Sequence, residues 1–168
     1  AGRCAGRRAD PAPAPREKGT AMKARRTPPV PHEMVDHTAD LGVVLMARGL
    51  SDLFAAAGAL LAELMYDPEE VEERESREVA LEAPSSEELL VRWLNELLYL
   101  REVGEFLWKT VEAEAEAGEG ARLTATLRGE VFRPGKHVPR GGLKAATYHQ
   151  LRISREGDAW SARIIFDV

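Results

Sequence analysis

Residues 111–117 read Val-Glu-Ala-Glu-Ala-Glu-Ala, an alternation of apolar and acidic side chains. Successive side chains of a β-strand point to opposite faces of its sheet, so this strand has one face against a core and the other in water. Residues 118–120, Gly-Glu-Gly, then turn the chain back into a second alternating segment with Leu123, Ala125 and Leu127. This pattern predicts an antiparallel hairpin and decides the class of the fold.

A second hairpin is predicted at the end of the chain, where residues 148–155 join residues 160–168 through Gly157-Asp158. The alternation in the last strand puts four apolar residues on one face: Trp160, Ala162, Ile164 and Phe166. Asp167 therefore lies on the opposite face. Residues 132–142, between the hairpins, hold two prolines and three glycines and are expected to form a loop.

Two segments have the three- and four-residue apolar spacing of amphipathic helices. The first contains Leu53, Phe54, Ala57, Leu60, Leu61, Leu64 and Met65. It is expected to start with Ser51 as its N-cap and to end before Asp67-Pro68. The second contains Leu89, Leu90, Trp93, Leu94, Leu97 and Leu98. It follows Ser85 and Glu88, which form a capping-box pattern. Residues 41–46 and 78–83 are expected to be strands.

Together these elements predict an α+β fold, with two amphipathic helices packed on a mostly antiparallel β-sheet in a single domain. The domain is expected to span residues 32–168. Residues 1–31 are rich in Pro, Ala and Arg and carry eight basic against two acidic residues, so a disordered basic tail is expected there. The rest of the chain carries 15 basic and 26 acidic residues, a net charge of −11.

Composition excludes several classes of function. No apolar run approaches the roughly 18 residues of a membrane span, so we expect a soluble protein without a membrane partner. The one cysteine, Cys4, lies in the tail, which is consistent with the reducing cytoplasm. A domain this acidic is not expected to hold RNA by itself, because phosphate binding needs a basic footprint. No phosphate-cradling glycine loop is present, so no bound nucleotide is expected.

Two aspartates interrupt apolar segments at opposite ends of the domain. Asp40 follows His37, and Asp167 precedes Val168, whose α-carboxylate adds another anion. A carboxylate in such a setting needs a cation or several hydrogen bonds. If the fold pairs these segments, a hard cation such as Ca²⁺ or Mg²⁺ would relieve their repulsion. The alternative is that Asp40 caps a turn and Asp167 is solvated.

Five segments in order resemble the archease family, from about residue 35 to residue 168. They are residues 37–40 (His-Thr-Ala-Asp), 52–57, 88–98, 144–149 (Lys-Ala-Ala-Thr-Tyr-His) and 166–168 (Phe-Asp-Val). The resemblance implies an archease-like domain that is not an enzyme but activates an RtcB-type RNA ligase in tRNA splicing. It would do so by promoting the guanylylation and multiple turnover of the ligase, and it would contact RNA only through the ligase. The resemblance also implies a divalent metal on Asp40, Asp167 and Val168, with Lys144 on the functional surface.

His37 and His149 are further candidates for this surface, because a histidine beside an aspartate can act as a base. No suitable nucleophile stands out, so no catalytic residue is assigned. Two other classes of function stay open. One is a general chaperone or modulator of nucleic-acid enzymes, and the other is a metal-dependent hydrolase that would use both histidines and both aspartates.

Overall fold

The computed structural model describes residues 32–37 and 40–168. The expected tail, residues 1–31, lies outside the described residues. The strands in chain order are β1 (His32–His37), β2 (Asp40–Ala47), β3 (Glu75–Ala83), β4 (Phe106–Gly118), β5 (Gly120–Val131), β6 (Ala145–Glu156) and β7 (Ala159–Asp167). The helices are α1 (Leu50–Met65) and α2 (Ser86–Glu102), with a short 3-10 turn at Pro68–Glu70.

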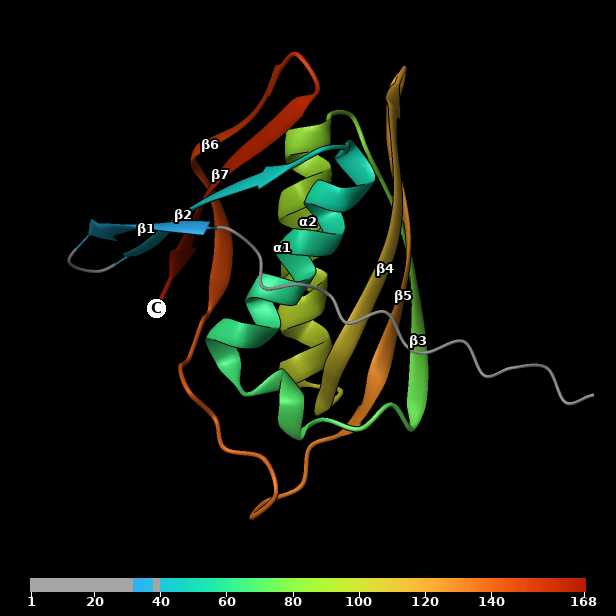
Figure 1. Ribbon diagram of the computed structural model, residues 1–168, viewed down its shortest axis with the longest axis vertical. Coiled ribbons are helices and arrows are strands. Elements are labelled where there is room, and N and C mark those ends of the chain that lie inside the picture. The colour runs from blue at the N-terminus through green and yellow to red at the C-terminus, as the bar shows by residue number, and fades with distance from the viewer. Residues whose placement is uncertain (1–31, 38–39) are drawn as a thin grey trace, which may run out of the picture.

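The strands form two antiparallel sheets, which we call sheet A and sheet B. Sheet A has the order β1-β2-β7-β6, and sheet B has the order β3-β5-β4. The two helices lie side by side between them, with sheet A on one side and sheet B on the other (Figure 1). The predicted α+β class and both predicted hairpins are confirmed. The division into two sheets is a feature that the local patterns did not predict.

The helices are buried on two sides, which explains how apolar their sequences are. Trp93 of α2 is fully buried and donates its indole N–H to the Phe54 carbonyl oxygen of α1 at 3.0 Å. Trp108 of β4 donates its indole N–H to the Gly58 carbonyl oxygen at 2.9 Å. These bonds satisfy the polar atoms of two large side chains that supply much of the buried apolar area.

One of the two predicted caps is present. Ser85 caps α2, since its hydroxyl oxygen accepts the Glu88 N–H at 3.2 Å. The prediction for Ser51 was wrong, because α1 begins at Leu50 after an extended Gly49. The Ser51 hydroxyl instead accepts the backbone N–H of Ala115 at 2.9 Å and donates to the carbonyl oxygen of Ala115 at 3.3 Å. Ser51 therefore ties the start of α1 to β4.

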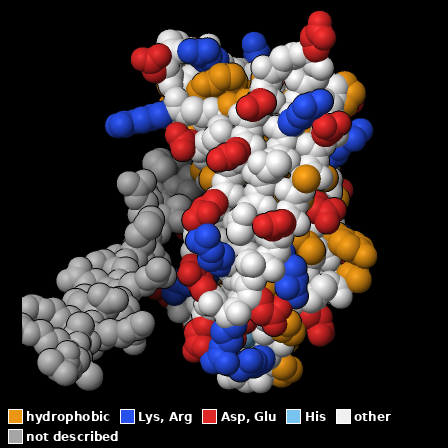
Figure 2. Space-filling view, turned by 90° about the vertical axis from the view of Figure 1, so that its right-hand side faces the viewer, with side chains coloured by type: hydrophobic (Ala, Val, Ile, Leu, Met, Phe, Trp, Pro, Cys, Tyr) orange, Lys and Arg blue, Asp and Glu red, His pale blue; other side chains and the backbone are white. Residues whose placement is uncertain are grey.

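The outer face of sheet B is covered with charges, as the alternation predicted. Figure 2 looks onto this side of the molecule and shows acidic and basic side chains interspersed. Glu112 pairs with Arg128 at 2.8 Å, and Glu82 pairs with Arg122 at 3.1 Å. Within the described part of the chain, no helix has the length and apolar character needed to cross a bilayer.

Candidate functional site

Asp40 and Asp167 lie opposite each other on neighbouring strands of sheet A. Asp40 is the first residue of β2 and Asp167 the last of β7, and the antiparallel register pairs them directly. Residues paired in this way project from the same face, with Cβ atoms about 5 Å apart. Asp40 is half-buried and Asp167 is exposed. The structure therefore brings together the two carboxylates that were predicted to share a site, at the end of sheet A where the chain terminates (Figure 1).

Lys144 lies beside this pair, just before the first residue of β6. Its backbone N–H donates to the Asp167 carbonyl oxygen at 2.9 Å, and Ala145 pairs with Asp167 in the register. The Lys144 ammonium donates to the Val168 main-chain oxygen at 2.9 Å. Lys144 is exposed, and its ammonium contacts the residue that follows Asp167. The grouping of Asp40, Asp167, Val168 and Lys144 is thus present in the geometry.

The two histidines are placed differently. The backbone of His37 pairs with that of Asp40, at the start of the same row across sheet A, and its side chain lies outside what the structure describes. His149 is exposed and lies in an irregular part of β6, between Thr147 and Arg152, where the register with β7 shifts. It is four residues from Ala145, roughly 13 Å at the usual strand rise. The structure does not bring His149 to the aspartate pair.

The donor set at this end of sheet A suits a weakly held hard cation. Asp40 and Asp167 supply two carboxylates, and Val168 supplies a further oxygen that the Lys144 ammonium also contacts. Among the described residues, no group of three or more His, Cys, Asp or Glu is placed to hold a metal ion. Mg²⁺ is often held by one or two carboxylates and keeps several waters, so it matches this set. The metal on Asp40, Asp167 and Val168 remains a prediction.

A second polar cluster, around Glu130, was not predicted. Glu130 is 1% exposed, and its Oε1 accepts hydrogen bonds from Lys136, from the Glu72 backbone N–H at 2.8 Å and from His137 at 3.2 Å. His137 is 4% exposed and accepts the Arg133 backbone N–H through Nδ1 at 2.9 Å, so Nε2 carries the proton that is donated to Glu130. The cluster anchors the loop between β5 and β6 to sheet B.

Ion pairs also hold the loop between β5 and β6, which carries Lys136 and Arg140. Lys136 also pairs with Glu72 at 3.4 Å, and Arg140 pairs with Asp67 at 2.7 Å. Arg140 donates its backbone N–H to the Met65 carbonyl oxygen at 2.8 Å. Lys136 and Arg140 are therefore paired with carboxylates of the same chain, and these ion pairs hold the loop in place.

Replacing Glu130 with glutamine should lower the stability of the protein most at neutral pH. Burial opposes ionisation of Glu130, but hydrogen bonds from Lys136, Glu72 and His137 outweigh it and lower the pKa of the carboxyl from 4.5 to about 2. A lowered folded-state pKa gives stability that is present above pH 4.5 and is lost as the pH falls toward 2. The free energy of unfolding, measured in urea at pH 7 and pH 3, should differ between wild type and Glu130→Gln more at pH 7.

Glu114→Gln is the matched control, because Glu114 lies exposed on the outer face of sheet B. It removes one negative charge from the surface and should change the free energy of unfolding by less than about 1 kcal/mol at either pH. An equal difference between wild type and Glu130→Gln at both pH values would contradict the role given to this cluster.

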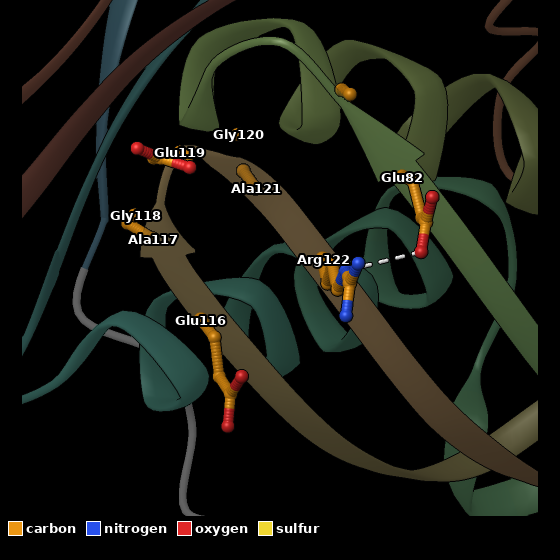
Figure 3. A pocket seen from close by; sticks show the side chains of 9 residues that line it. Glu82, Glu116, Ala117, Gly118, Glu119, Gly120, Ala121 and Arg122 are labelled. Carbon is orange, nitrogen blue, oxygen red and sulfur yellow. Dashed lines mark ion pairs between the residues drawn. The ribbon is translucent and has the colours of Figure 1, made fainter.

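A surface hollow lies away from the aspartate pair, at the β4–β5 hairpin. Figure 3 shows its lining of Glu82, Ala83 and residues 116–122, with the ion pair between Glu82 and Arg122 along one side. None of the residues predicted to form the site lies in it. Its carboxylates belong to the solvated outer part of sheet B, so the candidate functional site stays at the end of sheet A.

Comparisons with known proteins agree with this fold. Residues 32–168 match the family model described as the Archease protein family (MTH1598/TM1083). A protein archease of Pyrobaculum calidifontis is 35% identical over 142 residues, which cover 83% of this chain and 97% of that protein.

Two solved structures are also similar. The solution structure of Methanobacterium thermoautotrophicum protein 1598 has a TM-score of 0.69 and 31% identity, and the match covers 82% of this chain and 98% of that one. The crystal structure of a Thermotoga maritima archease, described as a possible chaperone, has a TM-score of 0.54 and 18% identity. That match covers 80% of this chain and 94% of the other. At this identity it supports the fold alone.

Proposed function

The chain belongs to the archease family, and from this premise we propose that it is a cytoplasmic accessory protein that activates an RtcB-type tRNA-splicing RNA ligase. It would promote guanylylation and multiple turnover of the ligase without being an enzyme itself. The observation that carries the proposal is the register of sheet A, which sets Asp40 opposite Asp167 and beside Lys144. Asp167 and Lys144 are exposed and Asp40 is half-buried, so this group of two carboxylates and one ammonium is suited to contact a charged site on a partner.

The mechanism follows from where the charges lie. The aspartate pair lies where β2 begins and β7 ends, and Asp167 is exposed there, so a partner could contact it. Its carboxylates could share a divalent cation or contact basic groups of the ligase, while Lys144 limits repulsion between them. GTP and the metal of the guanylylation step would be held by the ligase. The net charge of −11 outside the tail supports leaving the RNA to the ligase.

Asp40→Asn, Asp167→Asn and Lys144→Ala should each reduce the stimulation of a cognate ligase by about tenfold or more. Each change removes a charged contact of about 1.5–3 kcal/mol, and a factor of ten corresponds to about 1.4 kcal/mol. The rate of single-turnover guanylylation would be measured with and without the protein, at fixed GTP and Mg²⁺. Repeating the series over increasing Mg²⁺ would show whether the aspartate variants have lost sensitivity to the cation.

Glu116→Gln, an exposed carboxylate change on sheet B, should stimulate the ligase as wild type does. Failure of the wild-type protein to accelerate guanylylation would sink the proposal. Suppression of aggregation of unfolded client proteins without a ligase would then favour a chaperone function, as suggested for the Thermotoga maritima archease. Turnover of a hydrolysable substrate by the isolated protein, lost in Asp40→Asn, would favour the hypothesis of a metal-dependent hydrolase.

A further inference from the structure

Two arginines face each other on the outer face of sheet A without a carboxylate partner. Arg163 of β7 and Arg152 of β6 are directly paired in the antiparallel register, so both side chains leave the same face. That face is the one opposite the core, because Ile153 and Ala162 of the next row pack against the buried cluster. No ion pair found among the described residues involves either arginine.

The side chain of Arg163 is incompletely satisfied. Its Nε is buried and has no hydrogen-bond acceptor within the described part of the chain. Like charges directly opposite each other on neighbouring strands destabilise a sheet, and a buried donor without an acceptor destabilises the fold further. Both costs would be removed by an anion that accepts from the two guanidinium groups at once.

Two hydroxyls lie in the neighbouring row of the same face. Ser154 pairs with Ser161, two residues from Arg152 and from Arg163 on the same two strands. Both serines are half-buried, and neither side chain makes a hydrogen bond within the described residues. The two rows form a compact square of four donors, which we call the donor square: Arg152, Arg163, Ser154 and Ser161.

Several carboxylates lie around the donor square, and none forms an ion pair with either arginine among the described residues. Glu87 of α2 accepts the Ile153 backbone N–H at 3.4 Å, between Arg152 and Ser154 along β6. Glu156 lies two residues beyond Ser154 on β6, and Glu33 of β1 pairs with Val44 in the arginine row, two strands from Arg163. Asp167 lies on the same face four residues along β7 from Arg163, roughly 13 Å at the usual strand rise. The acidic pair and the donor square are thus separate places on one face.

We propose that the donor square is a binding site for a phosphate group. Two guanidinium groups offer paired N–H donors that match phosphate oxygens bidentately, and hydroxyls can donate to the remaining oxygens. A tetrahedral anion presents oxygens in several directions and can meet donors from two rows, whereas a planar carboxylate presents only two oxygens. This inference does not depend on the function proposed above, because it uses neither Asp40, Asp167 nor Lys144.

Titration of the full chain with inorganic phosphate at low ionic strength tests the site. Backbone amide shifts of Ser154 and Ser161 should change saturably. Arg152→Gln and Arg163→Gln should each weaken binding about tenfold or more, since a charge-assisted bond contributes about 1.5–3 kcal/mol. Arg155→Gln is the matched control. Arg155 is exposed on the same strand but stacks over Trp160 at 5.5 Å, so its variant should bind as wild type does.

Absence of saturable shifts, or equal weakening by Arg155→Gln and Arg152→Gln, would overturn the proposal. Arg152 is exposed, so Arg152→Gln should fold even if Arg163→Gln does not, and Arg163→Lys would keep the charge while losing the paired donors.

Three further ligands show which kind of phosphate group binds: adenosine monophosphate, adenosine and a short single-stranded RNA without terminal phosphates. Binding of the monophosphate alone supports a terminal phosphate, and binding of the RNA as well supports backbone phosphodiesters. Equal binding of adenosine and the monophosphate would overturn a phosphate site.

Discussion

Gly129→Ala should destabilise the protein by about 3 kcal/mol or more, because the added methyl group has no space. Gly129 is in the central strand of sheet B and pairs with Trp108 where β4 has a register shift. A Cβ at this position would overlap the Leu107 carbonyl oxygen and lie 2.7 Å from the Trp108 Cα. These are backbone atoms, so β4 and β5 would have to separate. Urea unfolding followed by circular dichroism would measure the loss.

Gly118→Ala is the matched control, since it is also a glycine-to-alanine change in sheet B. Apart from Gly118 itself and its two neighbours in the chain, no heavy atom lies within 4 Å of the Cβ that would be added there. The change should therefore alter the free energy of unfolding by less than about 1 kcal/mol. Equal losses in the two variants would show that the close approach of β4 to Gly129 is not what makes glycine necessary there.

Elements with strong local signals could be predicted from the sequence. The hairpins at residues 118–120 and 157–158 follow from alternation and turn residues, and the cap of α2 follows from Ser85 and Glu88. Ser51 shows the limit of such reasoning. Its position before an apolar helical pattern is typical of an N-cap. In the structure its hydroxyl instead forms hydrogen bonds with the backbone of Ala115, which is distant in sequence. Tertiary contacts of this kind leave no local trace.

The two polar sites, the aspartate pair and the Glu130 cluster, also depend on contacts between segments that are distant in sequence. The juxtaposition of Asp40 and Asp167 depends on pairing between β2 and β7, which no local pattern specifies, and it was predicted through the family resemblance. Glu130 was missed because the alternation of β5 places it on the outer face of sheet B, where Arg128 and its neighbours are solvated. The loop that carries Lys136 and His137 folds back over it. Burial of Glu130 thus comes from a loop whose path the sequence pattern does not determine.

Trp93→Ala should cost about 3–5 kcal/mol, a large part of the roughly 5–15 kcal/mol that stabilises a domain. Trp93 is fully buried between α1 and the sheets, and its ring fills the space that Gly58 leaves open. A Cβ on Gly58 would lie 3.2 Å from the Trp93 Cζ2 atom, so the two helices approach as closely as the ring allows. Truncation of Trp93 leaves a cavity in the helix layer. Because the helices pack against a sheet on each side, they cannot move together to fill it. Thermal and urea unfolding would measure the cost.

Two further substitutions show why Trp93→Ala lowers the free energy of unfolding. Trp93→Phe keeps most of the ring but removes the N–H that donates to the Phe54 carbonyl oxygen, so its loss should be smaller than that of Trp93→Ala. Tyr99→Ala removes an aromatic ring from the same helix at a position that is 56% exposed, and it should cost less than about 1 kcal/mol. If Tyr99→Ala were as damaging as Trp93→Ala, the rings of α2 would stabilise the helix itself. The predicted order instead indicates that Trp93 stabilises the protein through the packing of α2 against α1, between the two sheets.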